Sequence, residues 1–532
     1  MLVRLRPVVH ASPAPDGLHL RGWASSCTIT GGAGLWKVWQ RLAPQLAEGL
    51  PASDLGVPEG TAPAVRAAVE MILEQLRAHD MLVEVPEEWG PDAPAPDIAA
   101  WLESVADRPV EAWRRLRAVT VTVAGTGVLA GMAVRAATAA GLAVVVVPGG
   151  ETAAAGSVAV ETTGGTPHVG AADTSLVAAD DSSLVVSAGK FLVLAGCGAD
   201  VGHVLPPTEP RLNLVNTEAI DVADRLGLTG EPTEVLAALI GSAAVHRLIC
   251  AVAGLPDPST EFVVHPGEAV PETTFPMALV ARLDPLRATY HPLLTRSQRT
   301  LDATHLTTDD PWRAFEALVD PELGPVETPR FGALPQVPAN LATSGDALGI
   351  GTTAEAARLD AALNAIKTDG VVGLTKSHAR GSALRLAARF HQGEPVPERE
   401  WATHATARRW WKALTLRFAV PAEATVERLA PNAFKAEIRH QQRILAWSIE
   451  ATAGDAVAFA ALAATGYAQA GRDGTAHLNG AAPQKVDDEQ PDWITPEWLW
   501  PADVRDREEA LQTTLAALPN IKIEPSTLDG AR

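Results

Sequence analysis

The sequence predicts a multidomain α/β protein, and three observations support this fold class. Its 532 residues exceed what one hydrophobic core holds, and at roughly 100–200 residues per domain the length corresponds to about three domains. One segment reads as strand, helix, strand, which is the unit of a parallel sheet. Proline-rich linkers separate segments that have different patterns. We therefore expect domains at residues 1–90, 97–300 and 301–532.

The first segment begins with strands. Apolar residues alternate with polar ones over residues 3–9 and again over 18–20, and a turn at 13–17 separates the two runs, so we expect a β-hairpin. The run Cys27, Thr28, Ile29 and Thr30 predicts a short third strand, because two glycines directly follow it.

Three helices follow these strands. The pattern predicts helices near residues 35–42 and 51–55, and a third helix that begins at Pro63. The third helix keeps an apolar stripe on one face for three turns. The members of this stripe are Val65, Ala68, Val69, Ile72, Leu73 and Leu76. The segment closes on a strand at 82–85, before a proline-rich linker at 86–96.

The second segment contains the strand–helix–strand unit. A buried strand at 119–124 leads through a glycine turn into a helix that ends near Ala140, and a second buried strand covers 144–147. This order predicts a parallel sheet. Strand-like runs at 184–187 and 191–194 extend it, and a helix is expected at 235–252.

The glycine turn has two interpretations. Gly125, Gly127 and Ala130 match the pattern G-x-G-x-x-G/A, in which bare backbone lets a phosphate approach a helix N-terminus. A dinucleotide fold also needs an acidic residue at the end of the second strand to hold a ribose, and no acid follows that strand before Glu151. We favour the structural interpretation, in which the glycines allow tight packing, and expect this chain to hold no cofactor.

The third segment changes character again. A proline-rich stretch covers 318–338, a glycine turn 345–353 and an alanine-rich helix 354–369. Residues 401–417 and 426–449 look helical, and the acidic, proline-rich tail from 482 is expected to be partly disordered until a helix at 493–518. Within 401–417, Trp410 and Trp411 follow two arginines; they are either interface anchors or part of the local core.

Charge and cysteine content exclude several classes. The chain has 43 basic and 63 acidic residues, a net charge of −20, and no clustered Lys/Arg run, so nucleic acid is not the expected partner. Its three cysteines are far apart, which excludes a disulfide framework and a Cys-x-x-Cys metal site. The N-terminus lacks the hydrophobic region of a signal peptide, and the most apolar stretch, 133–147, is too short for a membrane span. We expect a cytoplasmic protein with no membrane or metal association.

The order of these elements resembles a known family. A hairpin with three helices, a linker and the strand–helix–strand unit resemble the "ocin-ThiF-like" F proteins of thiazole/oxazole-modified, thiopeptide-type peptide biosynthesis. In that family a PqqD-like, winged-helix RiPP recognition element precedes a degenerate, Rossmann-type ThiF-like domain. Active ThiF-type adenylating enzymes have a ribose-binding acid and often cysteine-bound zinc, which this sequence lacks. The resemblance implies the fold without the activity.

The third segment is similar to the opening of a YcaO cyclodehydratase domain, an α+β fold. The resemblance lies in 318–326, 334–338 and the glycines of 349–353. In YcaO enzymes a Glu-x-x-Glu pair on the next helix holds magnesium against ATP, but the aligned positions here are Asn364 and Lys367. Either this is a degenerate ATP site, or the alignment is shifted and Glu355 or Asp360 serves instead.

The resemblance also implies a function. A precursor's leader peptide would add as a strand along Cys27–Thr30, against the wall formed by Val65, Val69, Ile72 and Leu73. The chain would be a non-catalytic subunit that delivers the precursor to a separate YcaO cyclodehydratase. That partner would use ATP and Mg²⁺ to form azolines at Cys, Ser or Thr. Two alternatives stay open: a ThiF-type adenylating enzyme, and a nicotinamide-dependent oxidoreductase suggested by the glycine turn alone.

Overall fold

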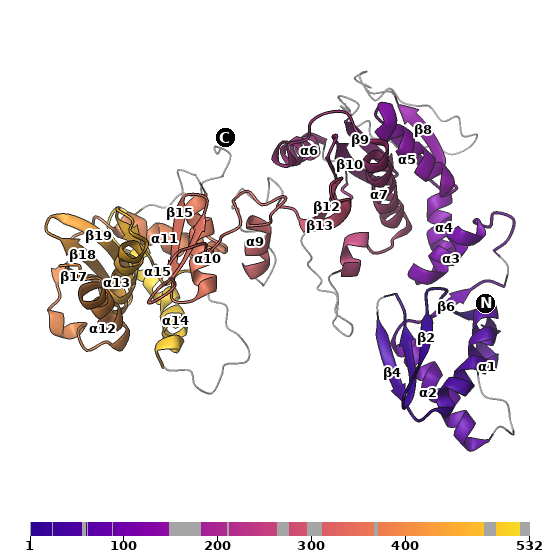
Figure 1. The fold of residues 1–532 in the computed structure, drawn as a ribbon, viewed down its shortest axis with the longest axis horizontal. Helices are drawn as coiled ribbons and strands as arrows, with labels where there is room; N and C mark the ends of the chain where they lie inside the picture. Colours follow the sequence, from indigo (N-terminus) through magenta and orange to yellow (C-terminus); the bar gives the residue numbers. More distant parts are fainter. Residues whose placement is uncertain are drawn as a thin grey trace. The chain divides into compact units, whose positions relative to one another are not determined.

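The computed structural model of the chain divides into two compact units. Unit 1 contains residues 1–272 and 276–291, and unit 2 contains 273–275 and 292–532 (Figure 1). Each unit is a mixture of helices and sheets, so the predicted multidomain α/β class is confirmed, while the finer boundaries near residues 90 and 300 stay a prediction. The structure describes residues 2–23, 25–55, 60, 62–87, 89–147, 182–209, 212–262, 276–294, 311–366, 371–483 and 496–521.

The N-terminal part of unit 1 contains two small antiparallel sheets, with strand orders β5-β1-β6 and β2-β3-β4, and two long helices. Its elements are β1 (Leu2–Leu5), β2 (His10–Ala14), β3 (Gly17–Arg21), β4 (Ser26–Thr30), α1 (Gly34–Glu48), β5 (Leu50–Pro51), η1 (Ala52–Asp54), α2 (Pro63–Ala78) and β6 (Leu82–Val85). The predicted third strand and third helix are present. A hairpin closes at the predicted turn, but its first strand is β2, which begins at His10, and not the predicted run 3–9. Of that run only residues 3–5 lie in a strand, β1, which belongs to a different sheet, because a turn follows Arg6.

These elements enclose their own hydrophobic core. Leu18 and Leu20 of β3 are fully buried against Trp39 of α1 and Leu76 of α2. Arg6 connects this part to the next helix of unit 1: its guanidinium donates to the backbone oxygens of Glu103 and Ala106, at 3.1 and 2.8 Å. Because the Arg6 side chain is almost fully buried, these bonds satisfy donors that water cannot reach.

The rest of unit 1 is built around a seven-stranded sheet with the order β13-β12-β11-β10-β9-β7-β8. Its elements are α3 (Pro96–Val105), α4 (Pro109–Arg117), β7 (Thr120–Ala124), α5 (Gly127–Ala139), β8 (Ala143–Val147), β9 (Ser183–Ala188), β10 (Phe191–Cys197), β11 (Val201–Val204), α6 (Leu212–Leu226), α7 (Glu234–Ala253), η2 (Pro258–Phe262), β12 (Met277–Arg282) and β13 (Arg287–Pro292).

The prediction of a parallel sheet holds only for the β7–β8 pair, which α5 connects. The neighbouring pairs β7–β9, β9–β10, β10–β11 and β11–β12 are antiparallel. For β9–β10 and β10–β11 the reason is connection length: only Gly189 and Lys190 separate β9 from β10, and three residues separate β10 from β11. A parallel pair needs a crossover of about a dozen residues or more.

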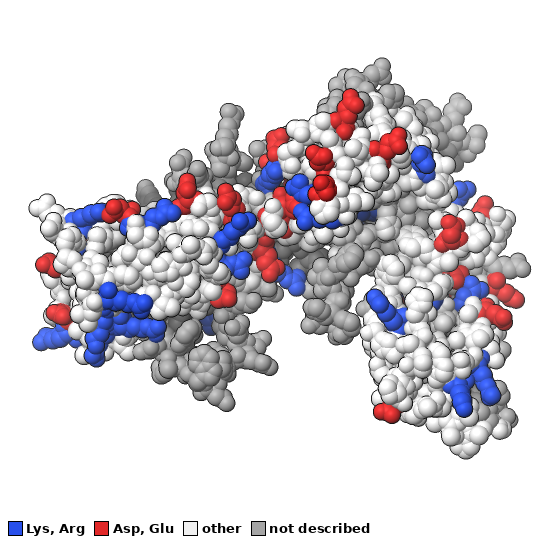
Figure 2. All heavy atoms as spheres, in the orientation of Figure 1, with Lys and Arg blue, Asp and Glu red and all other residues white. Residues whose placement is uncertain are grey.

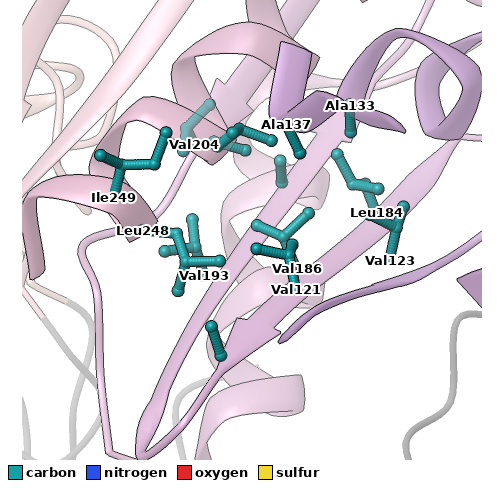
Figure 3. Packing of buried hydrophobic residues seen from close by; sticks show 14 of the residues in the cluster. Val121, Val123, Ala133, Ala137, Leu184, Val186, Val193, Val204, Leu248 and Ile249 are labelled. Atoms are coloured by element: carbon teal, nitrogen blue, oxygen red, sulfur yellow. The ribbon is translucent and has the colours of Figure 1, made fainter. Parts of the chain in front are cut away.

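The core of this sheet is formed by aliphatic side chains from strands and helices (Figure 3). Val121 and Val123 of β7 and Val186 of β9 lie against Ala133 and Ala137 of α5, whose small side chains let the helix lie close to the strands. α7 is long and apolar enough to be a candidate membrane span by composition. Here it packs against α5 and β10, and its buried residues include Ile240 and Leu248.

Unit 2 contains a hairpin, a five-stranded sheet of order β16-β17-β18-β19-β20, and several helices. Its elements are α9 (Pro311–Leu318), β14 (Asn340–Ser344), β15 (Ala347–Gly351), α10 (Ala354–Ala365), α11 (Lys376–Ala388), β16 (Glu394–Pro395), η3 (Glu398–Glu400), α12 (Ala405–Lys412), η4 (Ala413–Arg417), β17 (Glu423–Ala430), β18 (Ala433–His440), β19 (Arg443–Glu450), α13 (Ala453–Ala470), β20 (Ala476–His477), α14 (Pro496–Asp506) and α15 (Glu508–Ala516).

Two sequence predictions in unit 2 are wrong. Residues 426–449 are not helical: they form parts of three antiparallel strands, which turn at Asn432 and Gln441, both with positive φ. The expected glycine turn at 345–353 is a β-hairpin, in which Gly349 and Gly351 belong to strand β15. In both places antiparallel pairing between consecutive strands, rather than the pattern within one segment, decides the structure.

The core of unit 2 also contains a buried ion triad. Arg385 of α11 is fully buried and donates to both carboxylates of Glu450 and Glu508, with N–O distances of 2.9 and 2.7 Å. These partners come from β19 and α15, so the triad fixes the C-terminal helix to the sheet. Removing one partner would leave a buried charge uncompensated, which typically costs about 3–5 kcal/mol.

Candidate functional site

The first candidate site is the edge of strand β4. Within the part of the chain that the structure describes, this strand of the sheet β2-β3-β4 pairs with β3 alone. All four residues that the sequence predicted, Cys27 to Thr30, belong to β4. An edge strand presents unpaired backbone N–H and C=O groups, which is the template that an added strand uses.

The hydrogen-bond pattern identifies which backbone groups point outward. Gly22 donates to Ser25 at 2.8 Å and Gly31 to Asp16 at 2.9 Å, which makes both cross-strand pairs hydrogen-bonded ones. Hydrogen-bonded and non-hydrogen-bonded pairs alternate along an antiparallel ladder. In the register of β3 with β4, the backbone groups of Cys27 and Ile29 therefore point to β3. Those of Ser26, Thr28 and Thr30 point to the open edge.

The predicted wall residues on α2 divide into two sets. Ile72 and Leu73 are buried in the core that β3, α1 and α2 share, and Ile29 of β4 is buried in the same core. Val65 is 41% exposed and Val69 is half-buried. Since α2 contacts β4, the side chains that a strand added to β4 would reach are Val65 and Val69, together with the half-buried Cys27.

Charge around this edge comes from fewer residues than the sequence suggests. Of the five basic residues in 1–50, Arg4 pairs with Glu103 at 2.9 Å and Arg6 with Asp80 at 2.9 Å. Arg21, Lys37 and Arg41 are exposed. Of these five, Arg21, Lys37 and Arg41 are thus the ones most available to an acidic segment of a bound peptide.

The glycine turn of unit 1 lies at the predicted strand-to-helix junction. Gly125 has φ +150° and Gly127 has φ +70°, and α5 begins at Gly127. A Cβ at Gly125 would lie 3.0 Å from the backbone oxygen of Ser183, and the Gly125 amide donates to Val147. The turn is thus in tight contact with β8 and β9, as the structural interpretation requires. Glu151 lies outside the described residues.

The second candidate site is a cavity of about 350 Å³ in unit 2. It lies among β15, α10, α11, α13 and β20, and apolar side chains such as Leu359, Leu462 and Phe459 form much of its wall. Polar groups also line it: Asp360, Asn364, His378, Ser382, His477 and Asn479. A cavity with mostly apolar walls and a few convergent polar groups is the usual form of a small-molecule site.

Burial changes the ionisation of these groups. The Asp360 carboxylate accepts the Ile350 amide at 2.9 Å, and burial raises its pKa to about 7. Burial lowers the pKa of His378 to about 4. Burial, with the positive charges of Arg385 and Arg389 adding to it, lowers the pKa of His477 to about 3. Both imidazoles are therefore uncharged at neutral pH.

Only one of the two positions that align with the YcaO carboxylates is among the described residues. Asn364 lines the cavity and donates to the backbone oxygen of Leu348 at 3.1 Å. Lys367 lies outside the described residues. Asp360 lines the same cavity, whereas Glu355 is an exposed residue of the first turn of α10 and is not part of the lining. Among the residues that the structure describes, no group of three or more His, Cys, Asp or Glu side chains is arranged to hold a metal ion.

Basic side chains gather on one face of unit 2, over α12 (Figure 2). Arg408, Arg409, Lys412 and Arg417 are exposed on α12 and its continuation η4. Of the two tryptophans beside them, Trp410 is a core residue, 3% exposed, and Trp411 is half-buried and packs edge-on against Trp401 with ring centroids 5.7 Å apart.

Most of the cavity lining could not be predicted from the sequence. His378, Ser382, His477 and Asn479 belong to no motif, and about one hundred residues separate the first two from the last two. A signal was present in α10, where Asp360 and Asn364 interrupt an alanine-rich helix, but His477 and Asn479 belong to no helix. Local spacing alone could not show that they meet.

No family model matches this sequence, and no curated protein matches it. Among solved structures, the chain is similar to a heterocyclase in complex with substrate and cofactor, at 12% identity and a TM-score of 0.43, over 88% of this chain and 82% of that one. It is also similar to the heterocyclase TruD, at 13% identity and a TM-score of 0.40, over 87% and 82%. The E. coli protein MccB with AMPCPP and MccA matches 55% of this chain and 97% of its own, at 10% identity and a TM-score of 0.34.

Proposed function

We propose that this chain acts in the modification of ribosomally made peptides, as a non-catalytic subunit that binds the leader of a precursor peptide. The observation that carries this proposal is the open edge of β4 beside α2. The resemblance of the first ninety residues to a RiPP recognition element agrees with it.

The binding mode is strand addition. Outward-pointing backbone groups of Thr28 and Thr30 would hydrogen-bond to the leader, and every second leader side chain would contact Val65 and Val69 of α2. Backbone bonds of this kind supply affinity with little sequence preference, so specificity comes from the α2 face.

The two edges of this sheet are not equivalent. β2 forms the opposite edge and contains Pro13, which has no N–H to donate. Proline on an edge strand discourages pairing with another strand. β4 contains no proline, so strand addition is favoured at β4.

A separate, active YcaO cyclodehydratase would carry out the chemistry. It would supply ATP and Mg²⁺ and form azolines at Cys, Ser or Thr of the precursor. By holding the leader, this chain would raise the effective concentration of the core peptide at the partner's site. We place the contact with that partner in residues 301–532.

A matched pair of proline substitutions tests the leader site. Thr28→Pro removes an N–H at the open edge of β4. Ala11→Pro removes the corresponding outward N–H of β2, since Ala11 is in a non-hydrogen-bonded pair of the hairpin that closes on Ala14 and Gly17. Fluorescence anisotropy of a labelled leader should show binding at least about tenfold weaker for Thr28→Pro. Ala11→Pro should bind like the wild type.

Equal binding by the wild type and both variants would show that the leader binds elsewhere. Equal loss in both variants would show a general effect on the sheet, and the assignment to β4 would then be wrong. Circular dichroism of both variants checks that each is folded.

The partner contact is tested by co-purification. The active cyclodehydratase should co-purify with the full chain and should be lost when residues 301–532 are deleted. If the complex and azoline formation survive that deletion, unit 1 carries the contact instead.

A further inference from the structure

One helical surface of unit 2 has a charge opposite to that of the chain as a whole. Over residues 401–422 the sequence contains four Lys or Arg residues and neither aspartate nor glutamate, in a chain of net charge −20. These four are exposed on α12 and η4, and their side chains gather on one face of unit 2 (Figure 2). The leader-binding edge of β4 belongs to unit 1 and makes no use of them.

Helix geometry places three of these cations in a row. Arg408 and Lys412 are four residues apart, which puts them on the same side of α12. The next turn, η4, is a π-helix, whose hydrogen bonds join residues five apart, so Arg417 follows Lys412 on that side. Leu416 lies next to Arg417 and is 74% exposed. We call Arg408, Lys412, Leu416 and Arg417 the α12 row.

The cations of the α12 row repel one another, and little within the chain offsets this repulsion. Like charges four residues apart destabilise a helix. Among the residues that the structure describes, no ion pair joins Arg408, Lys412 or Arg417 to a carboxylate. A helix dipole favours Arg417 at the C-terminal end of η4, but it does not favour Arg408 two turns earlier. An acidic surface of another molecule would offset the repulsion.

The charge distribution restricts which molecule supplies that surface. At a contact with two-fold symmetry the same patch meets itself, so two copies of this chain would place cation against cation. Nucleic acid is disfavoured, because a chain of net charge −20 repels the phosphate backbone everywhere outside the row. An acidic face of a different protein fits both the cations and the exposed leucine.

We propose that the α12 row docks an acidic surface of the partner cyclodehydratase. This inference rests on the proposed function, which places the partner contact within residues 301–532, and it assigns that contact to one helix. Exposed cations attract and orient an acidic partner before contact. Leu416 then provides an apolar contact at the end of the row.

Charge reversal in the full-length chain tests the proposal. Arg408→Glu combined with Lys412→Glu should weaken binding of the purified cyclodehydratase at least about tenfold, measured by surface plasmon resonance. Arg408→Lys combined with Lys412→Arg keeps both charges and should bind within about threefold of the wild type. Wild-type binding should weaken when the salt concentration rises from about 50 to about 300 mM, because salt screens exposed charges.

Two single variants keep the test valid if the double charge reversal does not fold. Arg417→Glu reverses one charge on η4 and should weaken binding several-fold. Leu416→Ser removes the apolar group and should also weaken binding several-fold, but its salt dependence should equal that of the wild type.

The matched control is Lys376→Glu combined with Arg380→Glu on α11. These two exposed basic residues have the same spacing, and their reversal changes the net charge by the same amount. α11 shares a core cluster with Trp447 of β19, whereas α12 shares one with Ala446. Neighbouring strand residues point to opposite faces of a sheet, so the control lies on the other face. It should bind the cyclodehydratase like the wild type.

Three results would overturn the inference. Wild-type affinity in the folded double charge reversal, or in Arg417→Glu if the double variant does not fold, would place the contact elsewhere and leave the proposed function intact. Equal loss in the α11 control would show that only net charge matters. A wild-type chain that binds no cyclodehydratase would refute both this inference and the proposed partner. Leader binding, measured by fluorescence anisotropy, should be unchanged in every variant, which separates the α12 row from the β4 edge.

Discussion

Each unit contains a glycine-rich junction between a strand and a helix, and the glycines act differently in the two. In unit 1, Gly125 and Gly127 lie in the turn between β7 and α5 and adopt positive φ angles. In unit 2, Gly349 and Gly351 lie inside β15, ahead of the turn into α10. A Cβ at Gly349 would collide with the backbone of Ala357 and Ala361 in α10.

Glycine therefore has a different role at each junction, although the two glycine patterns look alike in the sequence. The glycines of unit 1 allow a backbone conformation that other residues rarely adopt. Gly349 is needed because α10 packs directly on the strand, where no side chain fits. Neither junction requires a phosphate to explain its glycines.

The largest effect is expected for Gly349→Ala. The added methyl group meets backbone rather than a flexible side chain, so α10 must move away from β15. We expect the free energy of unfolding of unit 2 to fall by about 3–5 kcal/mol. Urea titration followed by circular dichroism measures this. A loss below about 1 kcal/mol would mean that α10 lies less close to β15 than described.

A pH-dependent effect is expected for Asp360→Asn. The pKa of Asp360 is about 7 in the folded protein and about 3.9 when unfolded. The folded state thus holds this proton more tightly, and the wild type loses stability as pH rises from about 4 to 7. Asparagine has no ionisable group, so the Asp360→Asn variant does not lose stability in this way as the pH rises.

The stability of Asp360→Asn relative to the wild type should therefore increase by about 2–4 kcal/mol between pH 4 and pH 8. Thermal unfolding across this range provides the measurement. Asp346→Asn, at an exposed position in the β14–β15 turn, is the matched control. A relative stability that is flat with pH would show that the Asp360 carboxyl is not shielded from water.

A smaller effect is expected for Gly125→Ala in unit 1. The φ of +150° and the Ser183 oxygen 3.0 Å from the new Cβ both disfavour alanine. We expect a loss of about 1–3 kcal/mol, since a strained backbone position costs about that much. Hydrogen exchange of the β7 and α5 amides should locate the loss. Unchanged protection there would contradict the tight contact with β9.

Gly131→Ala should be neutral or slightly stabilising. Gly131 is an exposed helical residue of the same motif, and nothing lies within 4 Å of its added Cβ. Alanine in a helix interior gains about 0.5–1 kcal/mol over glycine. A melting temperature below that of the wild type would indicate that Gly131 has a role in binding or packing.

The smallest effect is expected from Mg·ATP. Among the described residues, neither glycine junction has an acid or cation placed to hold a nucleotide, so 1 mM Mg·ATP should shift the melting temperature by less than about 1 °C. Calorimetry that detects micromolar, magnesium-dependent ATP binding would refute this and favour an adenylating enzyme.

The sequence by itself determined the elements in which apolar residues recur at a regular spacing over many residues. The apolar stripe of α2 and the alternation in β3 and β4 directly reflect which face is buried. The β7–α5–β8 unit was also predictable from the sequence, because two apolar strands lie on either side of a helix that begins at a glycine. Strand β4 and its residues were therefore predictable.

The tertiary structure alone decided the rest. Three strands replaced the helix expected at 426–449, because the turns at Asn432 and Gln441 contain no glycine to mark them. The cavity of unit 2 joins Asp360 to His477 across more than one hundred residues of sequence. Local periodicity reports which side of an element is buried. It contains no information about which distant element covers that side, and packing supplies this.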